Sequence, residues 1–373
     1  MANQSTLISV TIVSHNNECC LVRCLDSVLG QDWPALELII VDNASHDGTR
    51  EILARYADRE PGRIRVIHNS ENRGFAAGQN QAMQQALGEW ILALNPDVLL
   101  LPNFVSALMQ AAGQDLTVGT VCGKLLRAHP DLSIPREPQM DSAGIYFTPT
   151  FRHFDRGMHQ PDGREYDVPA YVFGATGAAA FYRRTMVEDV SIEGEFFDED
   201  FFFSREDADV SWRAQLLGWK CLYTPQAVGY HVRRVFPGVR QHLPDSINRH
   251  SVKNRFLMRL KNSSLALYFR NWLPVTVRDL GIAAYCLVRE RASLDAFGFL
   301  IRNRSRILAK RRLVQSRRRV PDAYIQSWFR FRPVSLPAPA SHQAGQNTST
   351  PATAASRQIL PVPIRETGSS QLR

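Results

Sequence analysis

The sequence predicts an α/β fold built on a doubly wound, mostly parallel sheet with flanking helices. In the first hundred residues, short β-branched apolar runs alternate with segments whose apolar residues recur at helical spacing. Strands that alternate with helices in this way form parallel sheets covered on both faces. The chain has 373 residues, of which 44% are hydrophobic, so it can bury a complete core.

Four strands and three helices follow from this periodicity. The first helix begins soon after the first strand and ends at Gly30, and Pro34 precedes the second strand. These three elements make a β-α-β unit, which joins two parallel strands. The expected strands cover residues 7–13, 36–41, 63–67 and 90–94, and the expected helices cover residues 18–29, 49–57 and 76–87.

Polar side chains follow each of these strands. The carboxyl ends of parallel strands share one edge of a sheet, which is where α/β proteins bind ligands. Polar residues after a strand can simply form a turn. This explanation is weaker for Asp42, which ends an apolar strand. Neither the glycine-rich dinucleotide motif nor the P-loop is present, so a nucleotide would be bound by other means. The residues concerned are Ser14, Asn16, Asp42, Asn43, Arg73, Gly74, Asn95 and Asp97.

Three carboxylates, Glu206, Asp207 and Asp209, crowd into four positions directly behind a run of phenylalanines. Neighbouring carboxylates repel one another, and apolar surroundings disfavour the charged form. The pKa of at least one should therefore rise toward the range of a general base. An acidic first turn of a helix that ends at Gly218 explains the same residues without any chemistry. These residues alone leave both interpretations open.

Ten short motifs, taken in order, resemble glycosyltransferase family 2, the inverting enzymes of the GT-A fold, and most closely its bacterial rhamnosyltransferase-like members. The resemblance covers residues 7 to 265. Each motif is weak alone, but their order along the chain makes the resemblance specific. They include Val41-Asp42-Asn43-Ala44-Ser45, Asn72-Arg73-Gly74-Phe75, Leu94-Asn95-Pro96-Asp97, Glu206-Asp207-Ala208-Asp209, and Pro225-Gln226-Ala227 with His231.

The resemblance implies a role for each candidate residue. Asp207 would be the general base, with Glu206 as the alternative. Asp97 and His231 would hold a divalent cation, Mg²⁺ or Mn²⁺. The nucleotide-sugar would be bound by Ser14, Asn16, Asp42, Asn43, Arg73, Gly74 and Asn95. The acceptor side would be shaped by Gly174, Asp209, Trp212 and Arg213, although Trp212 fits core packing better.

Three positions depart from the pattern of the family. His15 stands where relatives mostly have tyrosine, Ala44 replaces a polar residue in the nucleotide loop, and Asn95 replaces the first aspartate of the Asp-x-Asp metal motif. The first two leave the nucleotide base and the donor sugar open. The third makes Asp97 the sole anionic metal ligand from that motif.

The resemblance also implies a reaction. A sugar would pass, with inversion, from a nucleotide-diphosphate donor to a hydroxyl of a glycan or lipid-linked glycan in bacterial surface polysaccharide or cell-wall synthesis. L-Rhamnose from dTDP-rhamnose is the first choice of donor, and a UDP-hexose is the alternative. A binding scaffold without catalysis would be expected to lack the base or the metal carboxylate. Asp207 and Asp97 are both present, which favours an enzyme.

Charge divides the chain into parts. The net charge is +8, yet residues 1–230 hold 18 Lys/Arg and 30 Asp/Glu, whereas residues 231–332 hold 23 and 5. We predict a GT-A domain over 1–232, with a nucleotide-binding half (1–100) and an acceptor and catalytic half (101–232). A basic helical extension over 233–332 and a disordered tail over 333–373 would follow.

The basic extension has no zinc-finger, RNA-recognition or helix-turn-helix pattern, so we expect no nucleic acid partner. Its arginines alternate with apolar residues at helical spacing, which suits an anionic membrane surface; a packed subdomain with a basic face explains this nearly as well. No apolar run reaches the roughly 18 to 20 residues of a membrane span, and the polar N-terminus predicts no signal peptide. We expect a cytoplasmic protein, either soluble or peripheral on the cytoplasmic face of the inner membrane.

Overall fold

A computed structural model of the chain describes residues 6–233 and 243–338, which form one compact unit. The strands are β1 Ile8–Ser14, β2 Leu36–Asp42, β3 Ile64–His68, β4 Trp90–Leu94, β5 Val98–Leu100, β6 Val118–Arg127, β7 Met140–Ser142, β8 Ile145–Phe147, β9 His153–Asp155, β10 Ala170–Val172, β11 Ala179–Arg183, β12 Lys220–His231 and β13 Leu336–Pro337. The α-helices are α1 Glu18–Leu29, α2 Thr49–Arg59, α3 Gly74–Gln85, α4 Phe104–Ala112, α5 Arg184–Val190, α6 Glu206–Leu216, α7 Asp245–Asn262, α8 Leu265–Arg270, α9 Trp272–Val288, α10 Asp295–Arg302, α11 Arg304–Ser316 and α12 Asp322–Trp328. Short 3-10 helices are η1 Arg164–Tyr166, η2 Glu199–Phe201 and η4 Arg291–Leu294.

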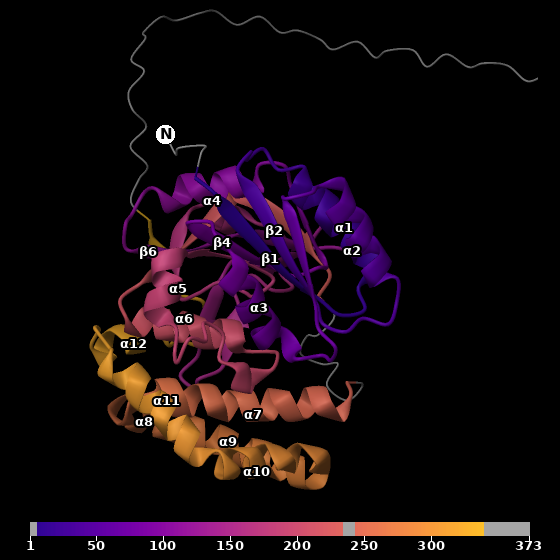
Figure 1. Ribbon diagram of the computed structural model, residues 1–373. Coiled ribbons are helices and arrows are strands. Elements are labelled where there is room, and N and C mark those ends of the chain that lie inside the picture. Colours follow the sequence, from indigo (N-terminus) through magenta and orange to yellow (C-terminus); the bar gives the residue numbers. More distant parts are fainter. Residues whose placement is uncertain (1–5, 234–242, 339–373) are drawn as a thin grey trace, which may run out of the picture. The chain divides into compact units, whose positions relative to one another are not determined.

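The central sheet has the order β13-β10-β12-β6-β11-β4-β1-β2-β3. Of these strands, β1, β2, β4 and β6 are labelled in Figure 1. The neighbours from β4 to β3 are parallel, in a register that places Ser14 opposite Asp42. β11 enters antiparallel between β4 and β6, and β12 then runs parallel to β6. The prediction of a mostly parallel α/β sheet is confirmed, and the predicted strands and helices of the first hundred residues occur in their predicted order.

Burial explains why these segments form this sheet. Every residue of β1 and β4 is buried, as expected for strands covered on both faces. α3 contacts β1 and β2, whereas α1 contacts α2 and β5. α1 directs one stripe of its surface into the core at helical spacing, consisting of Cys20, Leu21, Cys24, Leu25 and Val28.

The predicted helical extension is confirmed and lies beneath the α/β part in Figure 1. α7 contacts α6 and η2 and also packs against α10 and α11. Leu257 and Met258 of α7 join the main hydrophobic core. None of the described helices has the length and apolar character needed to cross a membrane. The predicted boundary at residue 232 stays a prediction.

The structure differs from the predicted disordered tail at residues 333–338. β13 pairs antiparallel with β10, with Leu336 opposite Tyr171, and Val334 packs against the core. The edge of β10 offers backbone N–H and C=O groups, and an extended segment can satisfy them without any apolar period. The rest of the predicted tail, 339–373, and residues 234–242 of the predicted extension lie outside the described residues.

Candidate active site

Two adjoining cavities open where the carboxyl ends of β1, β2 and β4 meet. The strand-end pocket has a volume of about 250 Å³, and its lining includes His15, Asn43, Asn72, Gly74, Asn95 and Asp97. The carboxylate pocket has a volume of about 310 Å³, and its lining includes Asn95, Asp97, Glu206, Asp207 and His231. Asn95, Asp97 and Phe203 line both cavities. Residues that are far apart in the sequence therefore line two cavities that share part of their walls.

Four predicted nucleotide-binding residues line neither cavity. Ser14 is buried and its hydroxyl donates to Asn17 at 3.3 Å. Asn16 lies at the rim, where its Oδ1 accepts the His46 amide at 2.8 Å. Arg73 is exposed just before α3. These residues surround the strand-end pocket, and their contact with a ligand stays a prediction.

Asp42 is the fourth of these residues, and its carboxylate is fully buried against the protein. Arg50 Nε donates to it at 2.7 Å, the Ser45 amide donates at 3.0 Å, and His68 Nδ1 lies 3.2 Å away. Burial raises the pKa of Asp42, but these hydrogen bonds together lower it below its ordinary value. In this conformation Asp42 orders the loop that carries Asn43.

Asn43 joins the loop after β2 to the start of α3. Its side-chain nitrogen donates to the Gly74 carbonyl at 3.0 Å and to Asn72 Oδ1 at 3.2 Å. Its side-chain oxygen accepts from Asn69 at 2.8 Å. Because Asn43 is buried and both ends of its amide are bonded, the wall of the strand-end pocket is ordered before any ligand binds.

Asp97 and His231 are far apart in sequence but meet in the carboxylate pocket. β12 pairs with β5 and so places His231 opposite Val98, beside Asp97. Asp97 Oδ1 and His231 Nε2 are 3.6 Å apart. His231 Nδ1 lies 2.7 Å from Asp141 Oδ2; a carboxylate can only accept, so Nδ1 carries the proton. In the neutral ring, the lone pair of Nε2 is therefore on the Asp97 side.

This pair fits a divalent cation that is held partly by a substrate. A metal-binding histidine usually donates its second N–H to a carboxylate, as His231 does to Asp141. Mg²⁺ is commonly held by one or two protein groups together with substrate phosphates. In residues 6–233 and 243–338, no group of three or more His, Cys, Asp or Glu side chains could hold a metal. Asp97 and His231 would therefore need further ligands from the substrate.

Burial lowers the pKa of His231, but the charges of Asp141 and Asp97 raise it above its ordinary value overall. A cation and a second proton would therefore compete for Nε2. Asp141 was not predicted from the sequence, because a single aspartate outside any motif gives no signal. Its place on β7, which pairs with β6, could not be read from periodicity.

The turn before α6 has an unusual backbone. Three of its residues have φ between 66° and 75°, a region in which each L residue is strained by about 1–3 kcal/mol. The side-chain amide of Asn254, in α7, donates to three carbonyls of the turn. The strained residues are Phe202, Ser204 and Arg205, and the carbonyls are those of Phe201, Phe203 and Ser204. The C-terminal helices therefore hold the segment that carries the predicted base.

Asp207 lies in the first turn of α6 and lines the carboxylate pocket. Its Oδ2 accepts the Gly177 amide at 2.9 Å, and its Oδ1 accepts the Ala208 amide at 2.7 Å. Burial raises the pKa of Asp207, although these hydrogen bonds offset part of that effect. Burial and the charge of Asp207 raise the pKa of Glu206 to about 8.

Glu206 Oε2 is buried and has no hydrogen-bond partner among the described residues. Donated hydrogen bonds stabilise an anion, and Asp207 has two of them. At neutral pH we therefore assign the proton to Glu206 and the negative charge to Asp207. This assignment favours Asp207 over Glu206 as the base.

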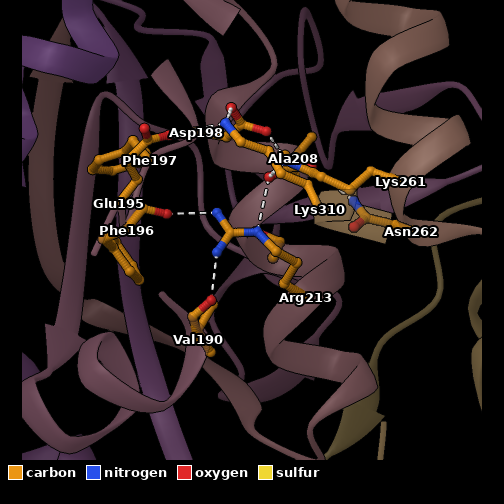
Figure 2. Close-up of polar contacts among 12 residues, drawn as sticks. Val190, Glu195, Phe196, Phe197, Asp198, Ala208, Arg213, Lys261, Asn262 and Lys310 are labelled. Atoms are coloured by element: carbon orange, nitrogen blue, oxygen red, sulfur yellow. Dashed lines mark hydrogen bonds and ion pairs between the residues drawn. The ribbon is translucent and has the colours of Figure 1, made fainter. Parts of the chain in front are cut away.

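The residues predicted to shape the acceptor side line neither pocket, and three of them, Asp209, Trp212 and Arg213, belong to α6 itself. Asp209 accepts from Arg213 Nε at 2.9 Å, and Arg213 also reaches the carbonyls of Val190 and Phe196 (Figure 2). Trp212 is fully buried in an aromatic cluster. These side chains support the helix from the core, and no described contact links them to the cavity.

Gly174 also supports α6 from behind. A Cβ added to Gly174 would lie 2.0 Å from Ser211 Oγ, so only glycine lets α6 approach. None of these residues lines the cavity. The acceptor roles predicted for Gly174, Asp209, Trp212 and Arg213 stay predictions.

Two buried lysines complete this support. Lys261 of α7 donates to Asp209 at 2.9 Å and to Asp198, and Lys310 of α11 donates to Asp198 at 2.6 Å (Figure 2). The carboxylate of Asp198 is buried, which raises its pKa, but the two ammonium groups lower it well below its ordinary value overall. A carboxylate and a lysine so far apart in sequence have no shared motif, so sequence reasoning did not find them.

The chain is similar to known glycosyltransferases. Residues 9–190 match the model of the family described as "Glycosyl transferase family 2". This similarity to a family 2 glycosyltransferase domain ends before Asp207 and His231. The match to "Putative glycosyltransferase EpsH" of Bacillus subtilis is 24% identical over 273 residues, which is 72% of this chain and 69% of EpsH.

Other relatives match over shorter lengths. The "Putative teichuronic acid biosynthesis glycosyltransferase TuaG" of B. subtilis is 39% identical over 97 residues, which is 26% of this chain and 38% of TuaG. The "Succinoglycan biosynthesis protein ExoO" of Rhizobium meliloti is 28% identical over 141 residues, which is 36% of this chain and 40% of ExoO. The chain thus spans less than half the length of these two relatives.

Solved structures support the fold. GalNAc-T7, crystallised with UDP, GalNAc and Mn²⁺, has a TM-score of 0.53 and 17% identity over 69% of this chain and 48% of its own. Residues 1–349 of Staphylococcus aureus TarS have a TM-score of 0.50 and 17% identity over 83% of this chain and 86% of theirs. At these identities the likeness shows the fold alone, which is the GT-A fold that the sequence predicts.

Proposed function

We propose that the chain is an inverting glycosyltransferase that moves a sugar from a nucleotide diphosphate to an acceptor hydroxyl. One observation carries the proposal: Asp207 and the Asp97–His231 pair line one cavity that adjoins the strand-end pocket, in a chain whose residues 9–190 match family 2. A fold by itself does not define a reaction. A base and a potential cation site that face a shared space support a specific reaction class.

Asp207 is the proposed base. Its carboxylate takes the proton of the acceptor hydroxyl while that oxygen forms a bond to the anomeric carbon. The bond from this carbon to the diphosphate oxygen breaks, and its electron pair leaves with the diphosphate. Attack from the face opposite the leaving group inverts the configuration. A positioned base of this kind contributes about 100- to 10,000-fold to the rate.

Asp97 and His231 are the proposed cation ligands, and Mg²⁺ and Mn²⁺ suit a carboxylate and one imidazole. When bound, the cation would stabilise the negative charge of the departing diphosphate. Asp141 orients His231 through the 2.7 Å contact to Nδ1. The presence of UDP and Mn²⁺ in the GalNAc-T7 structure, which shares the fold, supports this proposal.

The proposed donor is dTDP-rhamnose, with a UDP-hexose as the alternative, and it rests on the family resemblance. The proposed acceptor is a glycan or lipid-linked glycan of a bacterial surface polysaccharide or cell wall. The names of two relatives, in teichuronic acid and succinoglycan biosynthesis, support this setting.

A peripheral position on the cytoplasmic face of the inner membrane is part of the proposal. α8 and α9 expose large apolar side chains, including Phe269, Trp272 and Leu280, which are 65%, 53% and 65% exposed. An interfacial helix with apolar residues and nearby arginines binds anionic lipid. Flotation with anionic and neutral liposomes tests this, and no binding to anionic vesicles would refute it.

The activity is tested with purified full-length protein, a panel of nucleotide sugars and Mg²⁺ or Mn²⁺. We expect donor-dependent transfer or hydrolysis that a chelator abolishes and the metal restores. Asp207→Asn should lose at least about 100-fold in turnover and still bind the nucleotide. Binding of a donor without turnover in the unmodified protein would favour the alternative, a catalytically inactive nucleotide-sugar-binding scaffold.

A further inference from the structure

The largest described cavity lies beside the carboxylate pocket and belongs to neither site discussed above. Its volume is about 810 Å³, and it lies between β9, the turn before α6, and helices α7 and α9. Phe203, Ser204 and Arg233 line both this cavity and the carboxylate pocket. A molecule bound here would therefore lie next to the pocket that Asp207 lines.

Positive charge dominates the lining. Five arginines line the cavity, and Asp155 is the one carboxylate among the described lining residues. Asp155 is already paired with Arg233 at 2.7 Å, and Arg233 is also paired with Asp141 at 2.7 Å. The five are Arg152, Arg205, Arg233, Arg255 and Arg278. We call this cavity the arginine pocket.

Among the described residues, the positive charges of Arg152 and Arg278 are not balanced by a paired carboxylate. Neither forms an ion pair with a carboxylate in residues 6–233 and 243–338. Arg278 donates to the Thr150 carbonyl at 3.0 Å, and Arg152 lies over the Phe154 ring at 4.1 Å from its centroid. Asp279, the nearest acidic residue in sequence, is paired with Arg259 at 2.6 Å instead.

The pKa shifts in the arginine pocket also indicate an excess of positive charge. Burial, with the charge of Arg152 next, lowers the pKa of Arg278 to about 10. Burial and the neighbouring arginines lower the pKa of His153, so its ring is neutral and adds no positive charge to the cavity. Cations that outnumber the anions in a partly buried space repel one another, and a bound anion would offset that repulsion.

The remaining lining is apolar, which restricts the kind of anion. Ile247 of α7 and Ile282 and Tyr285 of α9 face the cavity. Val277 and Leu280 of the same helix are 63% and 65% exposed, so α9 also presents apolar side chains to the solvent. Arginine binds phosphate groups with several parallel hydrogen bonds. A ligand with a phosphate and an apolar chain matches both parts of the lining.

We propose that the arginine pocket binds the phosphate or diphosphate of a lipid-linked acceptor, whose sugar hydroxyl then reaches Asp207. This inference rests on the proposed function, because it names the acceptor class of the same site. A phosphate-bearing glycan without a lipid shares the phosphate chemistry, but it would leave the apolar lining without a contact.

Binding to the full-length protein can be measured by calorimetry with a chelator present, so that no cation joins a diphosphate to Asp97 and His231. The probes are farnesyl diphosphate, farnesol and inorganic pyrophosphate. We expect farnesyl diphosphate to bind most tightly, because it alone uses the arginines and the apolar lining together. If pyrophosphate binds as tightly as farnesyl diphosphate, the apolar chain contributes nothing and the ligand is not a lipid. If farnesol binds as tightly as farnesyl diphosphate, the arginines do not bind phosphate.

Variants test the residues. Arg152→Gln and Arg278→Gln should each weaken farnesyl diphosphate binding by about 10- to 100-fold. Arg278→Lys should recover part of the loss, since it keeps the charge. Arg312→Gln, at an exposed position of α11, is the matched control and should bind like the unmodified protein. Two Gln variants are used so that the test still works if one of them does not fold. Unchanged affinity for farnesyl diphosphate in the folded variants would refute the proposal.

Failure of this inference can be told apart from failure of the proposed function. Donor turnover is measured separately in the unmodified protein. If a donor is turned over while the arginine variants bind farnesyl diphosphate normally, the inference alone is wrong. If farnesyl diphosphate binding depends on these arginines but no donor is ever turned over, the proposed function is wrong and the phosphate site stands.

Discussion

Lys261 Nζ lies 2.9 Å from Asp209 Oδ2, and neither side chain is exposed to solvent. Lys261 belongs to α7 and Asp209 to α6, two residues after Asp207. The C-terminal helices are thus joined to the helix of the proposed base through buried charge. They form part of the structure that positions Asp207, whatever further role their outer surface has.

Lys261→Met should unfold the chain more easily. It leaves Asp209 and Asp198 without one of their cations in a buried place, and breaking a buried ion pair in this way costs about 3–5 kcal/mol. The free energy of unfolding, measured by urea denaturation, should fall by that amount. Lys220→Met is the control, since Lys220 is 42% exposed and its pair with Asp115 should contribute only about 0–1 kcal/mol. Equal losses in the two variants would contradict the assignment.

Glu206→Gln should change how stability depends on pH. The folded chain holds the Glu206 proton up to about pH 8, whereas the unfolded chain releases it near the ordinary pKa of 4.5. Between these values the folded state binds more protons, so the free energy of unfolding falls as pH rises, by at most about 1.4 kcal/mol per pH unit.

Glu206→Gln removes this loss, so its stability relative to the unmodified chain should increase from pH 5 to pH 8. Denaturation curves at several pH values measure the difference. Glu71→Gln, at an exposed position, is the matched control. A difference between Glu206→Gln and the unmodified chain that stays constant with pH would show that Glu206 titrates normally.

Asp141→Asn should weaken metal activation more than it lowers the maximal rate. Asp141 would act through His231, as a positioning residue, and loss of such a partner typically costs about 10- to 100-fold in metal affinity. The readout is the Mn²⁺ concentration that gives half-maximal activity, in protein shown to be folded by its melting curve. Asp162→Asn, which removes a partner of Lys124 away from this pair, is the control. An unchanged Mn²⁺ requirement would argue against His231 as a ligand.

Gly74→Ala should be worse than Gly62→Ala, although the two glycines have nearly the same backbone conformation. Their φ values are +83° and +80°, and an L residue there is strained by about 1–2 kcal/mol. A Cβ at Gly62 would meet nothing within 4 Å, whereas one at Gly74 would lie 2.6 Å from Phe202.

Only Gly74→Ala should therefore disturb the strained turn, lowering turnover as well as stability. Denaturation and turnover assays on both variants measure the two effects. If Gly62→Ala lowers turnover as strongly, contact with Phe202 is not the cause.

Much of the fold could be predicted from the sequence because its signals are local. The spacing of Cys20, Leu21, Cys24 and Leu25 marks a helix face, and the apolar run from Leu36 to Val41 marks a buried strand. Parallel pairing then brings Asn43 and Asn95 to one edge. The segment 333–338 could not be predicted in this way, because an unfilled sheet edge, and not its own composition, makes it a strand.

The residues of the candidate site were likewise predicted only where local sequence motifs contain them. Asp97, Asp207 and His231 stand in motifs, so the sequence alone named them as a base and cation ligands for a glycosyl transfer. Whether they act so stays a prediction, but the tertiary structure brings all three to one cavity.

The tertiary structure alone decided the partners of these residues. Asp141 on His231, Asn254 on the strained turn and Lys261 on Asp209 come from segments without motifs, and so do the arginines beside the cavity. The physical reason is that burial and long-range pairing set the charge of a group. Periodicity and spacing report which face of an element is apolar, and they carry no information on which distant charge lies opposite.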